Sequence, residues 1–309
     1  MMCRGRVPRP VKIGLGNPAP TIIFGGIFMA KIIDGKLISS KIKEQVKLNV
    51  EELKSKGINP ALAVILIGQD PASMVYVNNK EKTCNALGIG SKVYRLDETT
   101  TTEELLDLIN KLNKDDSVHG ILLQHPVPSQ IDEKLAFNTI LPEKDVDGFN
   151  NINVGKLSNN EKDAFVPCTP LGVLEMLKHE GIEIEGKHCV IVGRSSIVGK
   201  PMAKLMLNEN ATVTICHSKT KNLAEITRLA DILICTVGKP EFITANMVKE
   251  GAVVIDVGIN RVDGKLLGDV KFDEVSKVAG AITPVPGGVG PMTIAMLMKN
   301  TIKAVNNEK

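Results

Sequence analysis

Residues 190–203 read VIVGRSSIVGKPMA, an apolar run that enters a glycine turn and continues into a helix-forming segment. A strand, a glycine turn and a helix in this order place backbone N–H groups and the helix dipole where they can hold a phosphate. The glycines of the turn are Gly193 and Gly199, so the Gly-x-Gly-x-x-Gly spelling is absent and the turn alone is weak evidence. It predicts a nucleotide-binding α/β unit whose ligand must be identified from the next strand.

The segment that follows the next predicted strand contains no acidic residue. An enzyme for NAD usually places a carboxylate there for the ribose 2′-hydroxyl, whereas an enzyme for NADP has basic or hydroxyl groups. Here residues 217–220 read HSKT. Together with Arg194, the hydroxyl of Ser218 and its neighbours are expected to form a pocket for a 2′-phosphate, and a solvated polar loop is the alternative. The predicted cofactor is NADP.

Strand-like and helix-like apolar patterns alternate along the rest of the chain. Before the turn, strands are predicted at 61–67, 91–96 and 118–124, and helices at 36–56, 72–87 and 102–113. A polar stretch at 150–163 interrupts this rhythm, after which strands are expected at 188–192, 211–216, 231–237 and 252–258, and helices at 170–180, from Lys200, at 221–230 and at 244–250. This order predicts parallel sheets with helices on both faces. The predicted fold is therefore α/β, with two doubly wound domains, the second a Rossmann-type NADP-binding domain.

The domain boundaries follow from these patterns. The catalytic domain is expected to comprise residues 29–150 plus 286–309, and the NADP-binding domain residues 151–285. The amphipathic run at 292–305 is too short to be a domain, so it is predicted to be a helix that returns to the first unit. The cleft between the two units is the expected place of the reaction.

Residues 1–28 mix Arg, Pro and Gly without a period, and Met29 then opens a well-patterned segment. These residues are predicted to be a disordered leader, or to precede the true start of translation at Met29. A secretory signal is the rival, but Phe28 stands where its cleavage site needs a small residue.

Composition excludes several classes of function. The chain has 309 residues, of which 43% are hydrophobic and 24% charged, as in a globular protein, and its low aromatic content of 3% argues against nucleic acid as a partner. No stretch approaches the roughly 20 apolar residues of a membrane span. The six cysteines are scattered without a C-x-x-C pair, as expected for a reduced, cytoplasmic protein. Since the five histidines also contain no H-x-x-x-H pair, no metal site is predicted.

Candidate catalytic groups lie in the first half of the chain. Tyr76 and Lys80 are four residues apart in a predicted helix and project from one face, a pairing that by chance is usually a surface pair. Lys80 can act as a general acid or base only if its pKa is lowered toward neutrality, and Gln124, at the end of a predicted strand, is placed to orient it. Asp145 and Asp147 are loop aspartates that would usually cap a turn, yet either carboxylate could pair with an amino-substituted nitrogen ring.

Taken together, these pieces resemble one family. The segments YVNNK, GILLQHPVP, KDVDGF, PCTPLG, VGRSSIVGKPMA, CHSKT, DVGIN and TPVPGGVGPMT occur in the order typical of the bifunctional methylenetetrahydrofolate dehydrogenase/cyclohydrolases. The resemblance covers essentially residues 30–309, and the run at 284–293 is especially specific.

The resemblance implies an activity and a set of roles. The family oxidises 5,10-methylenetetrahydrofolate to the methenyl form with NADP and then hydrolyses it to 10-formyltetrahydrofolate in the same cleft. The implied catalytic and folate-binding residues are Lys80 as acid/base, Gln124 tuning it, Tyr76 against the folate and Asp147 at the pterin edge. The implied cofactor contacts are Gly193, Arg194, Ser195, Ser218 and Ile259, and the glycines expected to admit folate and nicotinamide are Gly287, Gly288 and Gly290. The resemblance also implies a homodimer built through the nucleotide units.

One residue departs from the family pattern, and two other functions remain open. The family commonly reads Gln-Leu-Pro where this chain has Gln124, His125 and Pro126. His125 is interpreted as a packing variant, with a changed folate contact or pH dependence as the alternative. The rival functions are an NADP dehydrogenase of the shikimate type, which has the same domain order, and a non-catalytic NADP-binding regulator.

Overall fold

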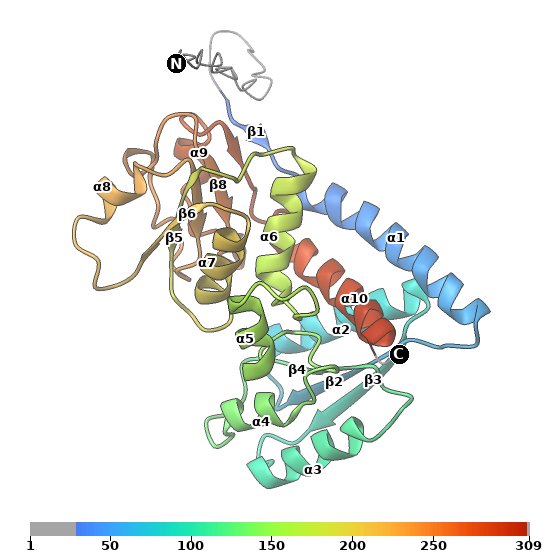
Figure 1. Ribbon diagram of the computed structural model, residues 1–309. Coiled ribbons are helices and arrows are strands. Elements are labelled where there is room, and N and C mark those ends of the chain that lie inside the picture. The colour runs from blue at the N-terminus through green and yellow to red at the C-terminus, as the bar shows by residue number, and fades with distance from the viewer. Residues whose placement is uncertain (1–28, 308–309) are drawn as a thin grey trace, which may run out of the picture.

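The computed structural model describes residues 29–307, so the predicted leader at 1–28 lies outside the described residues. Two α/β units lie one above the other in Figure 1, with long helices packed beside them. In the first unit, β2 (Ala61–Ile67), β3 (Gly90–Leu96) and β4 (Gly120–Leu123) form a parallel sheet in the order β3-β2-β4. The strand predicted at 118–124 is thus shorter than expected.

Both faces of this first sheet are covered. Alternate residues of β2 enter different cores: Leu62, Val64 and Leu66 pack with α1 (Gly35–Ser55) and α2 (Pro71–Leu87). Ala63 and Ile65 face α3 (Thr102–Asn113) and α4 (Glu133–Thr139) instead. The two-residue period of a strand explains this division, because successive side chains point to opposite faces.

The second sheet is the larger one. Within the described residues it has the order β1-β11-β8-β7-β5-β6 with every pair parallel. Its strands are β1 (Lys31–Ile32), β5 (His188–Val192), β6 (Thr212–Cys216), β7 (Ile232–Cys235), β8 (Val253–Asp256) and β11 (Ala281–Ile282). Helices α6 (Cys168–His179) and α7 (Gly199–Asn208) contribute to a core on one face, and α8 (Leu223–Thr227) and α9 (Phe272–Val275) to a core on the other. The predicted doubly wound α/β fold is confirmed.

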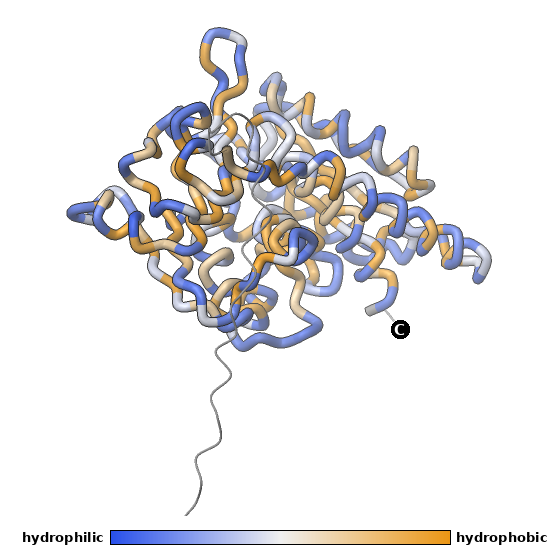
Figure 2. The backbone as a smooth tube through the Cα atoms, turned by 90° about the horizontal axis from the view of Figure 1, so that it is seen from above, coloured by the Kyte–Doolittle hydropathy of each residue, from blue (hydrophilic) through white to orange (hydrophobic). Residues whose placement is uncertain are grey.

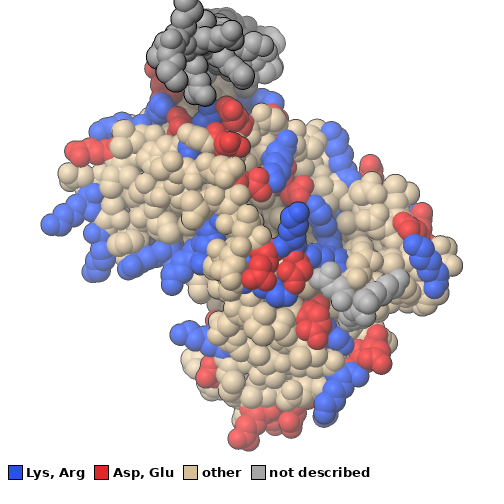
Figure 3. Space-filling view, viewed as in Figure 1, with Lys and Arg blue, Asp and Glu red and all other residues tan. Residues whose placement is uncertain are grey.

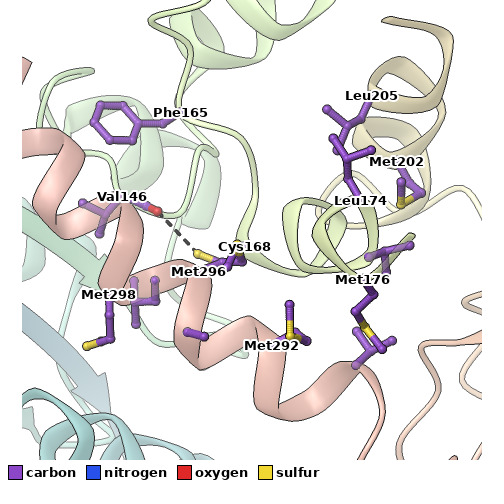
Figure 4. Packing of buried hydrophobic residues seen from close by; sticks show 14 of the residues in the cluster. Val146, Phe165, Cys168, Leu174, Met176, Met202, Leu205, Met292, Met296 and Met298 are labelled. Atoms are coloured by element: carbon purple, nitrogen blue, oxygen red, sulfur yellow. Dashed lines mark hydrogen bonds between the residues drawn. The ribbon is translucent and has the colours of Figure 1, made fainter. Parts of the chain in front are cut away.

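The chain crosses between the units at both ends. Strand β1 lies in the part of the sequence expected to form the first domain, yet it is hydrogen-bonded to β11 in the second sheet. At the other end, α10 (Val289–Asn307) packs between α1 and α6. Figure 4 shows Met292 of α10 directed toward α6, whereas Met298 points away from α6, and its sulfur accepts from Cys84 Sγ of α2 at 3.5 Å. Both methionines belong to one core that also includes residues of both sheets. The returning C-terminal helix was predicted, whereas the early crossing by β1 was not.

Several short elements differ from the sequence prediction. Helix α5 (Asn151–Ser158) lies inside the polar stretch that interrupts the predicted rhythm, with the side chain of Asn150 capping its start. The helix expected at 221–230 is reduced to α8, and that at 244–250 to the 3₁₀ turn Ala245–Met247. A hairpin of β9 (Asn260–Val262) and β10 (Lys265–Leu267) was not predicted.

Hydrophobic and hydrophilic residues are interleaved along the chain in Figure 2. Among residues 29–307, no helix is long and apolar enough to cross a membrane.

Candidate functional site

A cavity of about 380 Å³ lies between the two units, at the carboxyl ends of their strands. Its wall on the side of the first unit includes Lys80 and Tyr76 of α2, Gln124 just after β4, and Asp147. On the side of the second unit it includes loops that follow β7 and β8, and the start of α10. Ligands of open α/β sheets bind at this edge, so the cavity is the candidate site.

Helix α2 presents the candidate acid/base. Asp70 caps its start by accepting the backbone N–H of Ser73 at 2.7 Å, and Pro71 occupies the first helical position. Lys80 is buried, with 8% of its surface exposed, whereas Tyr76 one turn earlier is 38% exposed. The helix therefore points an amine into the cavity floor and leaves a phenol ring at its edge.

A short chain of hydrogen bonds orients the amine of Lys80. Its Nζ donates to Oε1 of Gln124 at 3.0 Å. The amide Nε2 of Gln124 in turn donates to the carbonyl of His125 at 2.6 Å, which fixes which side-chain atom of Gln124 faces the lysine. Because Gln124 also bonds through its backbone N–H to Ile65 of β2, the lysine is held against the edge of the sheet.

Burial sets the electrostatics of Lys80 and Asp147. Burial lowers the pKa of Lys80, and the nearby charge of Asp147 opposes this effect. Burial likewise raises the pKa of Asp147, with Lys80 opposing it. Burial also raises the pKa of Tyr76, so its phenol is protonated at neutral pH. A lysine whose pKa is lowered toward neutrality is suited to accept and return a proton.

The two loop aspartates have different surroundings. Asp145 accepts hydrogen bonds from the backbone of Phe149 and Asn150 and from the side chain of Asn153. Burial raises the pKa of Asp145 to about 6. Its oxygens are occupied by the chain itself, whereas Asp147 lines the cavity. Asp147 is thus the aspartate available to a ligand.

The glycine turn after β5 is tightly packed at both of its glycines. A Cβ atom at Gly193, whose φ is +133°, would lie 2.2 Å from the carbonyl oxygen of Thr236, and one at Gly199 would lie 2.4 Å from the carbonyl of Gly193. At these two positions the turn therefore has room for backbone atoms but not for a side chain. Ser195 accepts N–H bonds from Val198 and Gly199 and shapes the start of α7.

The groups expected at the 2′-phosphate are exposed near this turn. Arg194, Ser195 and Ser218 are exposed, and the N–H of Gly193 donates to the carbonyl of Cys216 at the end of β6. The loop after β6 is folded on itself, because the backbone N–H of His217 donates to the hydroxyl of Thr220. These four predicted cofactor residues, Gly193 included, are not part of the cavity lining. In Figure 3, Lys and Arg side chains gather along the lower left edge of the second unit, which suits an anionic ligand.

The three late glycines have different positions. Gly290 lines the cavity and lies near Ile259, which is also in the lining. Gly287 and Gly288 are not in the lining. A Cβ atom at Gly35 would lie 1.8 Å from the carbonyl of Gly288, and the N–H of Lys36 donates to the carbonyl of Gly287. These two glycines join the last turn to the start of α1.

Several residues of the cavity wall were not singled out from the sequence as site residues, among them Cys168, Thr169 and Thr293. Cys168 is buried beside Asp147, and burial holds the pKa of its thiol well above the usual value. Thr169 and Thr293 are hydrogen-bonded to each other at 3.0 Å, which joins α6 to α10. The motifs PCTPLG and TPVPGGVGPMT contain all three residues, so the family pattern includes them although no single residue type marks them as site residues.

His125, the departure from the family pattern, lies in the cavity lining beside Gln124 and pairs with Glu133 of α4. Its ring is 43% exposed, so this pair faces solvent. The structure describes no group of three His, Cys, Asp or Glu residues arranged to hold a metal ion within residues 29–307.

Two doubly wound units, a glycine turn and a buried lysine in the cavity between them define a two-domain, dinucleotide-binding enzyme. Residues 33–147 match the tetrahydrofolate dehydrogenase/cyclohydrolase catalytic domain, and residues 167–309 match the NAD(P)-binding domain of the same family. The chain belongs to this family, which confirms the resemblance drawn from the sequence motifs.

Relatives of known identity agree. The bifunctional protein FolD of Acetivibrio thermocellus is 61% identical over 276 residues, which cover 89% of this chain and 96% of the relative. The crystal structure of the FolD methylenetetrahydrofolate dehydrogenase/cyclohydrolase of Campylobacter jejuni has a TM-score of 0.89 at 54% identity and covers 91% of this chain and 100% of that one. The Trypanosoma brucei enzyme, solved with NADP and an inhibitor, has a TM-score of 0.87 at 39% identity. The match covers 91% of this chain and 98% of that one.

A shikimate dehydrogenase of Thermus thermophilus, solved with NADP(H) and shikimate, matches with a TM-score of 0.50 at 14% identity. A similarity at this level shows that the two chains share a fold and carries no information about the substrate of this chain.

Proposed function

We propose that this chain is a bifunctional one-carbon folate enzyme. It oxidises 5,10-methylenetetrahydrofolate to 5,10-methenyltetrahydrofolate with NADP and then hydrolyses the methenyl group to give 10-formyltetrahydrofolate. The observation that carries the proposal is the buried amine of Lys80, bonded to Gln124 in a cavity with walls from both units. Membership of the family and the NAD(P)-binding domain at 167–309 support both activities.

The first step needs positioning more than proton transfer. When bound, NADP supplies the acceptor for the hydride that leaves the methylene carbon. The glycine turn at Gly193 would hold its phosphates, Arg194 and Ser218 its 2′-phosphate, and Ile259 its nicotinamide end. On the opposite wall, Tyr76 would lie against the folate, and Asp147 would accept paired hydrogen bonds from the pterin edge. The two walls would thus bring donor and acceptor carbons together.

The second step needs a base. Water adds to the cationic methenyl carbon and must lose a proton, for which Lys80 is the group in place because burial lowers its pKa. The resulting carbinol opens by cleavage of its bond to N5: N5 takes up a proton from the protonated Lys80, while the carbinol hydroxyl loses its proton to solvent as the C=O bond forms. The formyl group remains on N10, and the lysine returns to its starting state. Gln124 keeps the amine aimed at the reacting carbon through its bond of 3.0 Å.

The assembly and location of the protein belong to the same proposal. We infer a cytoplasmic homodimer built through the NADP-binding unit. In support, β6 is an edge strand of the larger sheet, with Ile215 40% exposed, and an unpaired strand edge can be covered by a second copy. Cys84, Cys168, Cys189, Cys216 and Cys235 are free thiols, which fits a reducing compartment. Light scattering of the purified chain tests the dimer.

One assay tests the function. Methylenetetrahydrofolate and NADP are supplied together, and the absorbance of NADPH and of the methenyl compound is followed in time. We expect NADPH to form and the methenyl absorbance to decay faster than in buffer alone. NADPH formation with shikimate in place of the folate would instead indicate an NADP dehydrogenase of the shikimate type. Tight NADP binding without turnover of either substrate would favour a regulator.

A further inference from the structure

The carboxylate of Asp269 is fully buried in the wall of the candidate cavity and accepts hydrogen bonds from four N–H donors. The backbone N–H groups of Val237 and Gly238 donate to its Oδ2 at 2.6 and 3.0 Å. The backbone N–H of Lys239 donates to its Oδ1 at 2.9 Å, as does the side chain of Asn260 at 3.0 Å. Three consecutive peptide N–H groups thus surround one carboxylate, in an arrangement proteins use to bind anions.

Within residues 29–307, no basic side chain forms an ion pair with Asp269. Its charge is compensated by N–H dipoles, and hydrogen bonds to an ionised acceptor are about twice as strong as those between neutral groups. The segment it holds, 237–239, directly follows β7. Asn260 opens β9, beyond the end of β8. One carboxylate therefore ties together the loops that leave two neighbouring strands of the second sheet.

A second buried aspartate fixes Asp269 itself. Asp256, at the end of β8, accepts the backbone N–H groups of Asp269 and Val270 and also that of Gly258, each at 2.9 Å. A Cβ atom at Gly258 would lie 2.2 Å from Oδ1 of Asp269, so the chain passes the carboxylate with room only for hydrogen. The position of Asp269 is thus determined from its backbone as well as from its side chain.

The loops held by Asp269 form the cofactor side of the cavity. Thr236, Gly238, Gly258 and Ile259 all line it. The carbonyl of Thr236 also packs on Gly193 in the phosphate turn, at the contact that excludes a side chain there. A shift of the segment at 237–239 would therefore displace both the cavity wall and the phosphate turn at Gly193.

We propose that Asp269 is a positioning residue for cofactor binding, whose carboxylate holds the loops after β7 and β8 in the arrangement that receives NADP. This inference rests on the proposed function. The residues assigned to hydrolysis lie on α2 and at the end of β4, in the other wall, and hydrolysis uses no dinucleotide. Loss of the carboxylate should accordingly weaken NADP binding and spare hydrolysis, a division that general damage to the fold would not produce.

The test is Asp269→Asn, measured by titration of NADP binding and by hydrolysis of supplied methenyltetrahydrofolate. The amide keeps the size of the carboxylate, but whichever oxygen becomes NH₂, two N–H donors lose their acceptor. We expect the Kd for NADP to rise by about tenfold or more, and hydrolysis to stay within about threefold of the unchanged chain. The matched control is Asp231→Asn at the opposite end of β7, where the carboxylate also accepts a backbone N–H and pairs with Lys249. Its NADP affinity should not change.

Two outcomes would overturn the inference: a Kd for NADP within twofold of the unchanged chain, or a parallel loss of NADP binding and hydrolysis. If Asp269→Asn does not fold, Asn260→Ala decides, because it removes one donor and leaves the carboxylate in place. That variant should weaken NADP binding by about two- to fivefold with hydrolysis intact, and an unchanged Kd would overturn the inference. The unchanged chain is measured first, since its failure to bind NADP would reject the proposed function itself.

Discussion

Replacing Gln124 with Glu tests the role of Lys80 through its pKa. The substitution keeps the side-chain shape and puts a carboxylate where the amide oxygen now lies, 3.0 Å from the amine. Because a carboxylate shares its charge between two oxygens, its centre of charge lies about 4 Å from the amine, and two unit charges at that distance attract by about 4 kcal/mol at an effective dielectric constant of about 20. Since 1.36 kcal/mol corresponds to one pKa unit, the upper limit is a rise of about 3 units. Burial of the new carboxylate opposes its ionisation, so we expect the pKa of Lys80 to rise by about 1 to 3 units.

The sign of the effect can be read in a pH profile. Hydrolysis requires the neutral amine, so the rising limb of its pH–rate profile should move to higher pH by the same 1 to 3 units. At a fixed pH below the pKa of Lys80 in both chains, the rate should fall about 10- to 10³-fold. The assay is decay of methenyltetrahydrofolate absorbance across a pH series, after subtraction of the uncatalysed hydrolysis.

The matched control is Gln130→Glu, which adds the same charge outside the cavity lining. Gln130 donates to the carbonyls of Glu98 and Thr100, away from Lys80. Its profile should match that of the unchanged chain. An unmoved profile in Gln124→Glu, or one displaced to lower pH, would refute the assignment of Lys80 as the base.

Three further outcomes are expected. Lys80→Ala should slow hydrolysis by about 10² to 10⁴ while NADP still binds, and full hydrolysis in that variant would exclude the role. Joint replacement of Arg194 and Ser218 by Ala should lower the ratio of kcat/KM for NADP over that for NAD, and an unchanged ratio would place the 2′-phosphate elsewhere. His125→Leu breaks the exposed pair with Glu133, so the free energy of unfolding should change by no more than about 1 kcal/mol and both activities by no more than about threefold. A tenfold change in either activity would show that His125 contacts the substrate.

Much of the fold follows from local sequence patterns. The strands at 61–67 and 188–192 are continuous apolar runs, and the structure gives both with the predicted bounds. The helix with Tyr76 and Lys80 was equally readable, because its spacing, its proline at the first position and the glycine after it are local signals. Each of these elements contains enough information within its own residues to specify its structure.

Other features depend on distant partners. Strand β1 has only two residues, and its pairing with β11 is not encoded in either segment alone. Helix α5 is polar because it uses few residues in the core, and its start depends on the Asn150 cap. The late glycines were assigned from the sequence to ligand approach, yet Gly288 lies against Gly35, a contact that only the folded chain reveals.

The candidate site was also predictable only in part from the sequence. The spacing of Tyr76 and Lys80 placed both on one helix face, but the burial that lowers the pKa of Lys80 comes from packing. The choice between Asp145 and Asp147 required the structure, because both stand in one loop and only their hydrogen bonds distinguish them. Asp269 gave no signal in the sequence, since three of its four donors are backbone groups 30 to 32 positions earlier.

The pairing of β1 with β11 also constrains how the protein is made. Residues 31–32 leave the ribosome well before their partners at 281–282, which follow some 250 positions later in the chain. This edge of the larger sheet therefore stays open until β11 has emerged, and α10 can close over α1 only after that. A nascent chain halted midway would have a lysine on α2 and no opposite wall, so neither chemical step could begin on an unfinished molecule.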